Sequence, residues 1–589
     1  MAFRKAVVPV WMSKSSENSN KRYSAYKELD KLYLNTRISW TAKNRILDRW
    51  ESPEKAVQTI KNDPYSLIEE IYGIGFTIAD AIAKNLNIAH TSEKRIQAGI
   101  QHVLRDRIQM FGHTCVPVDY LVKDAAFILD LKLDLVEPEI DKLIEGLKII
   151  KDNNMISNHF YHKAEKEIAD KLLGILKHTN TLEYQSPDAR TLMRDQMEAI
   201  YRVIDNNVFI LTGAPGTGKT YTIKAIIDMY KGASIAMAAP TGKAAKRMIE
   251  QTGQHASTIH RLLGPYFNKM TGGFEFKHNS FNPMEYQIII IDESSMLSTW
   301  LMYKLLDAVE ENTKLIFVGD TYQLPPVGAG YILGDMLNSG IIPSVELNII
   351  KRQDPGLIIT NCHRIKDGKD IISAKGKDKD FFFIESNSTY DMKEKILEFM
   401  DHKIKEKFPE VDILKDVQIV APLREKTLCS CKSLNEEIQK TLNPNPYITK
   451  CRFKVGDKVI QTKNNYEMGI INGDIGYIQS IDMSNKAMVI QFEAPDRMIT
   501  IDAWKNELQL AYAITCHKFQ GSENKIILIP IHKSFGSLIM QRNWIYTAIS
   551  RAQDVCVLIG QRAEIPKIID RDYQIQRNTH LERFLREKS

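Results

Sequence analysis

The sequence predicts an α/β protein with two tandem parallel-sheet domains, a helical N-terminal domain and a small inserted β-barrel. Residues 23–185 carry apolar side chains at three-to-four spacing. After residue 186, short β-rich runs alternate with helical stretches, and 453–500 alternates in hydrophobicity around turn residues. Alternating strands and helices are typical of parallel sheets covered on both faces. One such sheet holds roughly four to six strands, so the number of runs indicates two domains.

Domain limits follow from breaks in these patterns. A Ser-, Asn- and Lys-rich stretch near the start predicts a flexible tail, and Ser186-Pro187-Asp188 ends the helical pattern. The predicted domains are 1–22 as the tail, 23–185 as the helical domain, 186–345 as the first α/β domain, 346–451 with 501–589 as the second, and 452–500 as the inserted barrel.

Seven β-rich runs are the predicted strands of the two sheets. They are Val208–Leu211, Ser234–Ala238, Gln287–Ile291, Leu315–Val318, Val417–Val420, Lys525–Ile529 and Val555–Ile559. Asn472-Gly473 between alternating segments predicts a hairpin of the barrel. Gly272-Gly273 lies among aromatic residues, so 264–286 is expected to form a second hairpin, inserted in the first α/β domain.

Composition limits the class of protein. The 589 residues carry a net charge of +6, from 79 basic and 73 acidic side chains, which suits a polyanionic partner without requiring one. The seven cysteines lack metal-site spacing, which favours a reduced, intracellular protein with no structural metal. No apolar run reaches membrane-spanning length, so we expect no membrane segment and a cytoplasmic location.

Residues 213–220 read Gly-Ala-Pro-Gly-Thr-Gly-Lys-Thr and directly follow an apolar run. This pattern is typical of a P-loop, in which Gly213, Gly216 and Gly218 let main-chain N–H groups approach phosphates. Lys219 is placed to reach the β- and γ-phosphates, and Thr220 to hold Mg²⁺. The sequence therefore predicts binding of a nucleoside triphosphate with Mg²⁺.

Two further strand ends carry polar residues suited to phosphate chemistry. Asp292 and Glu293 follow four isoleucines, so Asp292 is a candidate for the metal and Glu293 for the base that activates water. Gln323 follows the next strand and is a candidate γ-phosphate sensor. Gln196, upstream of the P-loop, is a candidate for the adenine edge. A solvated Asp-Glu turn and a proline-stiffened loop are the alternatives for the two strand ends.

Two distant arginines are candidates for the same site. The γ-phosphate transition state needs cations, and a neighbouring domain can supply an arginine. Arg352 opens the second α/β domain, and Arg551 lies near the C-terminus. From the residues alone, a surface role for both stays open.

A nucleic-acid site is suggested by hydroxyl, imidazole and lysine groups at strand ends, because such groups suit sugar–phosphate contacts. Helix capping by Thr241 and Ser257 is the alternative. The candidates are Pro240, Thr241, Lys243, Ser257, Thr258, His260, Thr515, His517 and Lys518.

Together these segments resemble the ordered motifs of superfamily 1 DNA helicases, most closely those of the RecD-like branch. The resemblance covers residues 190–565. It rests on Gly-Ala-Pro-Gly-Thr-Gly-Lys-Thr, Ala-Pro-Thr-Gly-Lys-Ala-Ala, Ser-Thr-Ile-His-Arg-Leu-Leu, Asp-Glu-Ser-Ser-Met, Gly-Asp-x-x-Gln-Leu-Pro-Pro-Val-Gly, Thr-x-His-Lys-x-Gln-Gly-Ser-Glu and Tyr-Thr-Ala-x-Ser-Arg-Ala.

The resemblance extends to the other domains. Residues 62–80 resemble the helix-hairpin-helix region of stand-alone RecD-like helicases, in which Gly73 and Gly75 would expose N–H groups to a DNA phosphate. A plain αα-turn is the alternative. The barrel is similar to the family's SH3-like domain, and 264–286 to its strand-separating pin. The two α/β domains would then be RecA-like domains 1A and 2A.

By this resemblance the chain would be an ATP- and Mg²⁺-dependent motor moving 5′→3′ on single-stranded DNA and unwinding tailed duplex. Arg352 and Arg551 would enter the site when the domains close. Repair, recombination or replication is the expected setting, with a monomeric motor and a single-strand-binding or repair protein as a candidate partner. No separate nuclease site is expected. A translocase that loads or remodels a partner without unwinding is the alternative, and an RNA motor is a third reading. Phe519 departs from the small polar residue common at that position.

Overall fold

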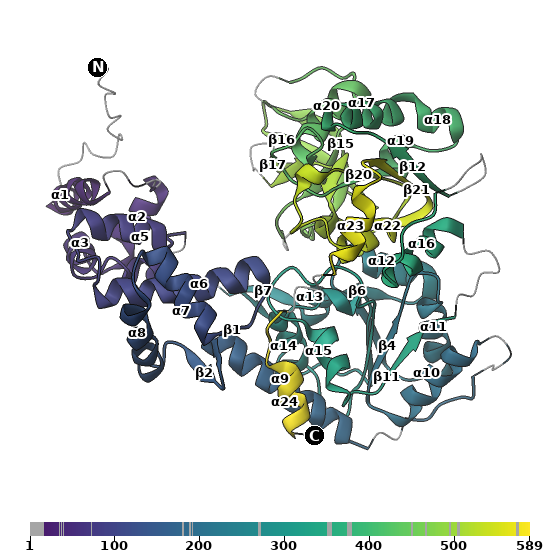
Figure 1. The fold of residues 1–589 in the computed structure, drawn as a ribbon, viewed down its shortest axis with the longest axis horizontal. Helices are drawn as coiled ribbons and strands as arrows, with labels where there is room; N and C mark the ends of the chain where they lie inside the picture. Colours follow the sequence, from purple (N-terminus) through teal and green to yellow (C-terminus); the bar gives the residue numbers. More distant parts are fainter. Residues whose placement is uncertain are drawn as a thin grey trace. The chain divides into compact units, whose positions relative to one another are not determined.

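The protein is described from a computed structural model (Figure 1). It describes residues 17–588 apart from 34, 35, 37, 39, 72, 180, 181, 188, 189, 191, 269–272, 350–355, 374–379, 449, 450, 466, 467, 494, 495, 503–506 and 573–576. The chain divides into two compact units, Met1–Lys163 and Ala164–Ser589, and each is described by itself.

The first unit is largely helical, as the sequence predicts. Its helices are α1 (Glu17–Leu32), α2 (Trp40–Arg49), α3 (Pro53–Asn62), α4 (Ser66–Glu70), α5 (Phe76–Asn85), α6 (Glu93–Phe111), α7 (Val118–Leu129) and α8 (Leu133–Glu145). Residues 17–22, predicted as part of the tail, form the start of α1. A small antiparallel sheet of β1 (Cys115–Pro117), β3 (Met155–Ser157) and β2 (Ile150–Asp152) also occurs, which helical periodicity did not predict.

The predicted hairpin joins α4 to α5. Gly73 has φ +93°, a conformation that favours glycine, and Gly75 is the residue that precedes the first turn of α5. Both glycines are exposed, and nothing lies within 4 Å of a Cβ built on either. No other atom therefore crowds the side of Gly73 and Gly75 on which a Cβ would lie.

In the second unit the P-loop sheet has six parallel strands. Their order is β11 (Ser344–Leu347), β4 (Val208–Gly213), β10 (Lys314–Gly319), β9 (Ile288–Ile291), β5 (Ile235–Ala239) and β6 (Ala256–Thr258). The central strands are fully buried and read as continuous apolar runs, as expected when helices cover both faces.

Alternation along β9 divides the core of this sheet. Ile288 and Ile290 pack in one cluster, and Ile289 and Ile291 in another. The first cluster includes residues of α10 (Arg194–Asp205), α11 (Lys219–Met229) and α12 (Gly242–Thr252). The second includes residues of α9 (His159–Lys177), α13 (Ile259–Leu263), α14 (Thr299–Asp307), α15 (Ile332–Ser339) and α24 (Leu581–Lys588).

The predicted hairpin insertion is present. β7 (Pro265–Asn268) pairs antiparallel with β8 (Gly273–Phe276), and Tyr266 lies opposite Glu275. The turn between the two strands lies outside the described residues. Tyr266, Phe267 and Phe274 are exposed on the hairpin.

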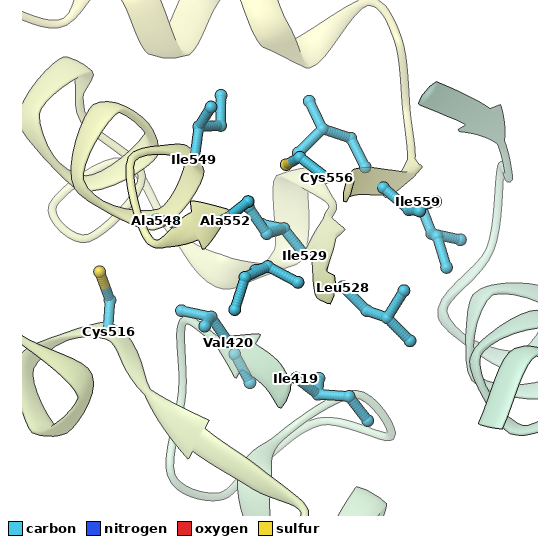
Figure 2. Packing of buried hydrophobic residues seen from close by; sticks show 14 of the residues in the cluster. Ile419, Val420, Cys516, Leu528, Ile529, Ala548, Ile549, Ala552, Cys556 and Ile559 are labelled. Atoms are coloured by element: carbon cyan, nitrogen blue, oxygen red, sulfur yellow. The ribbon is translucent and has the colours of Figure 1, made fainter. Parts of the chain in front are cut away.

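The second sheet has five parallel strands in the order β12 (Phe381–Glu385), β21 (Ala552–Gly560), β20 (Asn524–Ile531), β13 (Val417–Ala421) and β19 (Ala513–Thr515). Figure 2 shows Ile419 beside Leu528, its partner in the neighbouring strand. The same core includes Ile549 of α22 (Arg542–Ile549). Its other helices are α16 (Gly356–Lys366), α17 (Thr389–Glu398), α18 (Ile404–Lys407), α19 (Ile413–Asp416), α20 (Cys431–Leu442), α21 (Cys516–Phe519) and α23 (Glu564–Asp570).

The inserted segment is a five-stranded antiparallel sheet with its own core. The order is β17 (Asp496–Asp502), β16 (Ala487–Glu493), β15 (Ile475–Asp482), β14 (Lys458–Gln461) and β18 (Leu508–Leu510). β18 lies beyond residue 500, where the predicted barrel ended. A three-residue strand shows too little alternation to be recognised.

The end of the chain returns to the first sheet. Leu581, Phe584 and Leu585 of α24 pack in that sheet's core, although the sequence placed 501–589 in the second domain. Just before α24, the Arg577 guanidinium donates to the main-chain oxygens of Pro326, Gly328 and Gly330 at 2.5–2.8 Å. The return segment is thus fixed to the loop after β10.

Within the described residues, the helices are too short or too polar for any of them to cross a lipid bilayer.

A buried ion pair ties the hairpin of the first unit to its neighbours. Asp80 of α5 accepts hydrogen bonds from Arg95 Nε at 2.8 Å and from the Tyr65 hydroxyl at 2.9 Å. Arg95 also donates to the main-chain oxygen of Leu129 at 3.1 Å. Burial acts to raise the pKa of Asp80, but Arg95 and Tyr65 outweigh it and the pKa lies below its usual 3.8.

We predict that Asp80→Ala destabilises this unit by about 3 kcal/mol, because Arg95 would be left buried without its counter-charge. Hydrogen exchange of the α6 amides in the full chain should quicken about a hundredfold. Since the folded pKa is lowered, the contribution is complete above pH 3.8 and is lost as the pH falls below it. Glu51→Ala, in the exposed Glu51–Lys55 pair, is the control and should leave exchange unchanged.

Candidate active site

The P-loop joins β4 to α11, and its glycines are required by geometry. Gly216 has φ +82° and Gly218 φ +88°, values that side chains disfavour. A Cβ added to Gly213 would lie 2.6 Å from Thr217 Oγ1, and one added to Gly216 would lie 2.8 Å from Ile359 Cδ1. The loop therefore curls tightly before the positive end of α11, the arrangement that binds phosphate.

Two predicted side chains lie against this loop. Lys219 Nζ donates to the main-chain oxygens of Gly213 at 2.5 Å and Ala214 at 3.3 Å. Gln196 of α10 is fully buried, and its Nε2 lies 3.5 Å from the main-chain oxygen of Thr217. The structure thus brings Gln196, which is distant in sequence, to the P-loop as predicted.

Asp292 and Glu293 follow β9 directly. Glu293 has φ +52°, and its main-chain N–H donates to Asp292 Oδ1 at 2.8 Å. Burial, together with the neighbouring charge of Glu293, raises the pKa of Asp292 to about 6, while Lys219 acts in the opposite direction. Two carboxylates and one ammonium therefore share a poorly solvated site.

The turn after β10 adds Asp320 and Gln323. Asp320 Oδ2 accepts a hydrogen bond from the Tyr546 hydroxyl of α22 at 2.6 Å. Burial raises the pKa of Asp320, against the opposing effects of Lys219 and Tyr546. Gln323 Nε2 lies 3.5 Å from the same carboxylate, and Gln323 Oε1 is buried with no hydrogen-bond partner among the described residues.

Arg551, just after α22, reaches the site from the second sheet. It is 2% exposed, and its Nη1 lies 3.7 Å from Glu293 Oε1. Nε donates to the main-chain oxygen of Thr547 at 3.3 Å and Nη2 to Ser550 Oγ at 3.2 Å. Burial acts to lower the pKa of Arg551, but Glu293 and Glu523 outweigh it and the pKa is raised. Arg551 is thus a buried cation facing the carboxylate predicted as the base.

Oxygen ligands suitable for Mg²⁺ are present at the same place. Mg²⁺ prefers carboxylate and hydroxyl oxygens, which Asp292 and Thr220 provide. Thr220 lies in the first turn of α11 and is partly exposed. The partly buried carboxylate of Asp292, whose pKa is raised, is a group that a cation would stabilise in its ionised form.

Arg352 lies outside the described residues, so its place in the site stays a prediction. Sequence reasoning missed Asp320 and Tyr546 as site residues. Both lie inside quoted segments, Gly319-Asp320 and the Tyr-Thr-Ala-Ile-Ser-Arg run, but neither carries a signal apart from its neighbours.

The predicted DNA residues of the first domain take different positions. Thr241 Oγ1 accepts from the main-chain N–H of Ala244 at 3.3 Å, so Thr241 caps α12. Thr258 caps α13 in the same way, accepting from Arg261 N at 3.2 Å, and Ser257 does not. The capping alternative therefore holds for Thr241 but not for Ser257.

A groove of about 940 Å³ runs between the first domain and the barrel. Basic and hydroxyl side chains of the first domain face Ile471 and Asp496 of the barrel. The lining includes Lys246, Ser257, Thr258, Arg261, Ile471 and Asp496. Ser257 and Thr258 thus open onto a cleft with cations along its wall.

His260 and Lys243 are engaged inside the protein. The His260 ring packs on Trp300 and Phe276, with centroid distances of 6.1 and 5.9 Å, and burial lowers its pKa. Lys243 Nζ lies 5.6 Å above the ring of Phe519, which is fully buried. Phe519, at the position that departs from the family pattern, therefore packs beneath a lysine predicted to meet DNA.

Thr515 and Lys518 line a second cavity, of about 520 Å³, between the second sheet and the barrel. Arg424, Lys432 and Tyr447 line it as well. His517 is exposed. Pro240 directly follows β5, and Gly73 and Gly75 belong to the first unit.

Fold and site define a P-loop NTPase whose phosphate site is built from two parallel-sheet domains. Four family models match parts of the chain. They are an AAA domain over residues 196–329, the RecD2 DNA helicase HHH domain over 24–115, the RecD-like DNA helicase SH3 domain over 434–492 and the UvrD-like helicase C-terminal domain over 510–559.

Similar proteins agree with these matches. The ATP-dependent RecD2 DNA helicase of Deinococcus radiodurans is 29% identical over 85% of this chain and 70% of that protein. The RecBCD enzyme subunit RecD of Mycolicibacterium smegmatis is 28% identical over 72% of this chain and 81% of that subunit. A solved structure of Pif1 helicases on forked double-stranded DNA is 20% identical, covers 62% of this chain and 92% of that one, and has a TM-score of 0.39.

The chain thus carries the HHH and SH3 domains of the RecD2 type and a UvrD-like helicase C-terminal domain. It is an ATP-dependent DNA helicase.

We predict that Asp292→Asn raises the melting temperature of the nucleotide-free protein by a few degrees at pH 8, because it removes a poorly solvated charge. Since the folded pKa of about 6 lies above the usual 3.8, the charge destabilises the fold above pH 6 and has no effect below pH 3.8. The gain should therefore vanish in acid. Asp482→Asn is the control, because the Ser484 and Asn485 side chains lower the pKa of Asp482 to about 2 and the substitution should not stabilise.

Proposed function

We propose that the chain hydrolyses ATP between its two parallel-sheet domains and uses the cycle to move 5′→3′ on single-stranded DNA, unwinding duplex ahead of it. The observation that carries this proposal is the approach of Arg551 to Glu293 at 3.7 Å, because the two residues belong to different sheets. Hydrolysis then depends on closure of the two domains. The polarity rests on the RecD-like motifs.

Each side chain of the site has a proposed role. Lys219 binds the β- and γ-phosphates, and Gln196 contacts the adenine. Glu293 orients the attacking water and accepts its proton, since its carboxylate follows Asp292 and faces Arg551. Gln323 senses the γ-phosphate. Arg551, with Arg352 proposed beside it, offsets the charge that develops in the transition state.

Thr220 and Asp292 are the proposed ligands of Mg²⁺. When bound, Mg²⁺ would supply positive charge to the β- and γ-phosphate oxygens. Asp292 is held for this task by its own geometry, since Oδ1 accepts from the N–H of Glu293 and Oδ2 is left for other contacts.

Contacts between the domains also couple the site to the DNA residues. A Cβ built on Gly521 would lie 2.4 Å from Thr241 Oγ1, and Arg247 pairs with Glu523 at 2.5 Å. The proposed DNA-binding loops of the two domains therefore touch each other. Separation of the domains after hydrolysis would change the contacts that these loops make with the DNA strand.

We further propose that the motor works as a monomer in repair, recombination or replication. Single-stranded and tailed duplex DNA are the proposed substrates. The residues proposed to contact the DNA backbone are Ser257, Thr258, Thr515 and Lys518. Gly73 and Gly75 of the first unit are proposed to meet the duplex, because both are exposed residues just before the N-terminus of α5, where a phosphate can bind.

Glu293→Gln should slow ATP turnover at least about a hundredfold while leaving ATP binding intact, because the amide cannot accept the proton. Arg551→Lys should lower DNA-stimulated turnover by about 10³-fold, since it keeps the charge but loses the planar fork. Steady-state ATPase assays and nucleotide titrations measure both. Lys219→Ala is the reference for complete loss, and normal turnover in Arg551→Lys would remove Arg551 from the site.

Unwinding of a duplex with a single 5′ tail, compared with the same duplex carrying a 3′ tail, tests function and polarity together. We expect displacement with the 5′ tail only. Displacement from the 3′ tail would refute the polarity. Strong DNA-stimulated ATPase with no displacement would favour a translocase that loads or remodels a partner, and equal stimulation by RNA would favour an RNA motor.

A further inference from the structure

The loop after β10 belongs by sequence to the first domain, but part of it is packed in the second. Leu324 directly follows Gln323, the predicted γ-phosphate sensor. Its side chain is 5% exposed and lies in the hydrophobic core of the second sheet, which also contains Tyr546 of α22. Pro325 and Pro326 follow, and a proline restricts both its own main chain and that of the residue before it. A stiff segment therefore leads from Gln323 into the second domain.

Both main-chain polar groups of Leu324 are bonded by side chains of the second domain. Its N–H donates to Thr547 Oγ1 at 2.9 Å, and its oxygen accepts from Gln520 Nε2 at 2.9 Å. Thr547 is fully buried and Gln520 is 2% exposed. Buried main-chain groups need partners, and here one residue obtains both of them from another domain. We call these two bonds the Leu324 contact.

The direction of the bond at Thr547 is fixed by a second bond. The Thr547 hydroxyl donates its proton to the main-chain oxygen of Asn543 at 2.7 Å, so its oxygen is left to accept from Leu324. The preceding residue, Tyr546, donates to Asp320 at 2.6 Å. Two consecutive side chains of α22 therefore hold the segment 320–324 at both of its ends.

Gln520 connects the Leu324 contact to the segment proposed to bind DNA. It directly follows α21, which begins after Thr515 and contains Lys518. Among the described residues its side chain bonds to Leu324 alone, and its Oε1 is buried with no hydrogen-bond partner. A buried acceptor left unsatisfied is unfavourable, so stability alone does not account for this glutamine. Its amide joins the loop that carries Gln323 to α21.

We propose that Thr547 and Gln520 are positioning residues that couple the nucleotide site to the DNA site. By holding the main chain of Leu324, they make a displacement of Gln323 at the γ-phosphate shift α21 and the DNA-contacting residues beside it. The inference rests on the proposed function, in which Gln323 senses ATP and the α21 segment contacts DNA. Neither Thr547 nor Gln520 is assigned a contact with nucleotide or with DNA.

Such coupling has a measurable size and must be reciprocal. The factor by which an ATP analogue changes the affinity for single-stranded DNA equals the factor by which DNA changes the affinity for the analogue. One buried hydrogen bond contributes about fivefold to an equilibrium constant. Loss of either bond of the Leu324 contact should therefore bring this coupling factor about fivefold closer to one.

The test compares binding of a fluorescent oligothymidylate to the full chain with and without a non-hydrolysable ATP analogue. Thr547→Val removes the acceptor while keeping the shape of the side chain, and should bring the coupling factor about fivefold closer to one. Thr547→Ser keeps the hydroxyl and should leave the factor unchanged. Gln520→Leu removes the donor and should act like Thr547→Val. In all three variants the affinity for DNA alone and for the analogue alone should change less than about threefold.

Thr441→Val is the matched control. The Thr441 hydroxyl also donates to a main-chain oxygen one turn back in its own helix, that of Glu437 at 3.1 Å, but Thr441 is exposed on α20. The substitution removes the same group without altering the Leu324 contact, so the coupling factor should keep its wild-type value.

The inference would be overturned by an unchanged coupling factor in Thr547→Val or Gln520→Leu, by an equal loss in Thr547→Ser, or by a wild-type factor of one. A fall of both separate affinities at a constant factor would also overturn it, because the contact would then only stabilise the fold. If Thr547→Val does not fold, Gln520→Leu decides the outcome. Wild-type protein without DNA-stimulated ATPase would instead refute the proposed function.

Discussion

The acidic ends of the first sheet are satisfied by groups from the second, and this dependence organises the molecule. Asp320 accepts from Tyr546, and Glu293 faces the guanidinium of Arg551. Buried carboxylates are unfavourable without partners, so parting the two sheets exposes them to water or leaves them unsatisfied. Asp320 and Asp292 both interact electrostatically with Lys219. Whatever binds at the P-loop therefore alters the charge balance that holds the domains together.

Much of the architecture could be predicted because long buried strands appear in the sequence as continuous runs of apolar residues. All seven predicted runs are strands, and the four isoleucines of β9 divide between two cores. The strands of the two parallel sheets that were missed, β6, β11, β12 and β19, have three to five residues. In β11 exposed and buried residues alternate over only four positions, too few to distinguish from a loop. Such edge strands are defined by their partners and not by their own sequence.

The site could be predicted in part, because several of its residues directly follow strands of one parallel sheet. Carboxyl ends of parallel strands meet at one edge, which brings Lys219, Asp292 and Gln323 together as expected. His260 has the residue type of a DNA contact, but its ring packs on Trp300 and Phe276. Tyr546 could not be singled out, because its importance comes from its contact with Asp320, far away in the chain. Tertiary contact, not residue type, decides such roles.

The return of the chain to the first sheet limits how the second domain can move. The chain passes from the first domain to the second after β11 and returns to the first domain near its end. There Arg577 donates hydrogen bonds to the loop of Pro326, Gly328 and Gly330, and α24 packs in the core of the first sheet. A body anchored at both ends cannot swing freely like one on a single linker, and its motion reduces to rotation about the line joining the two anchors. One anchor is the loop that follows Gln323, so any such rotation pulls directly on the segment proposed to sense the γ-phosphate.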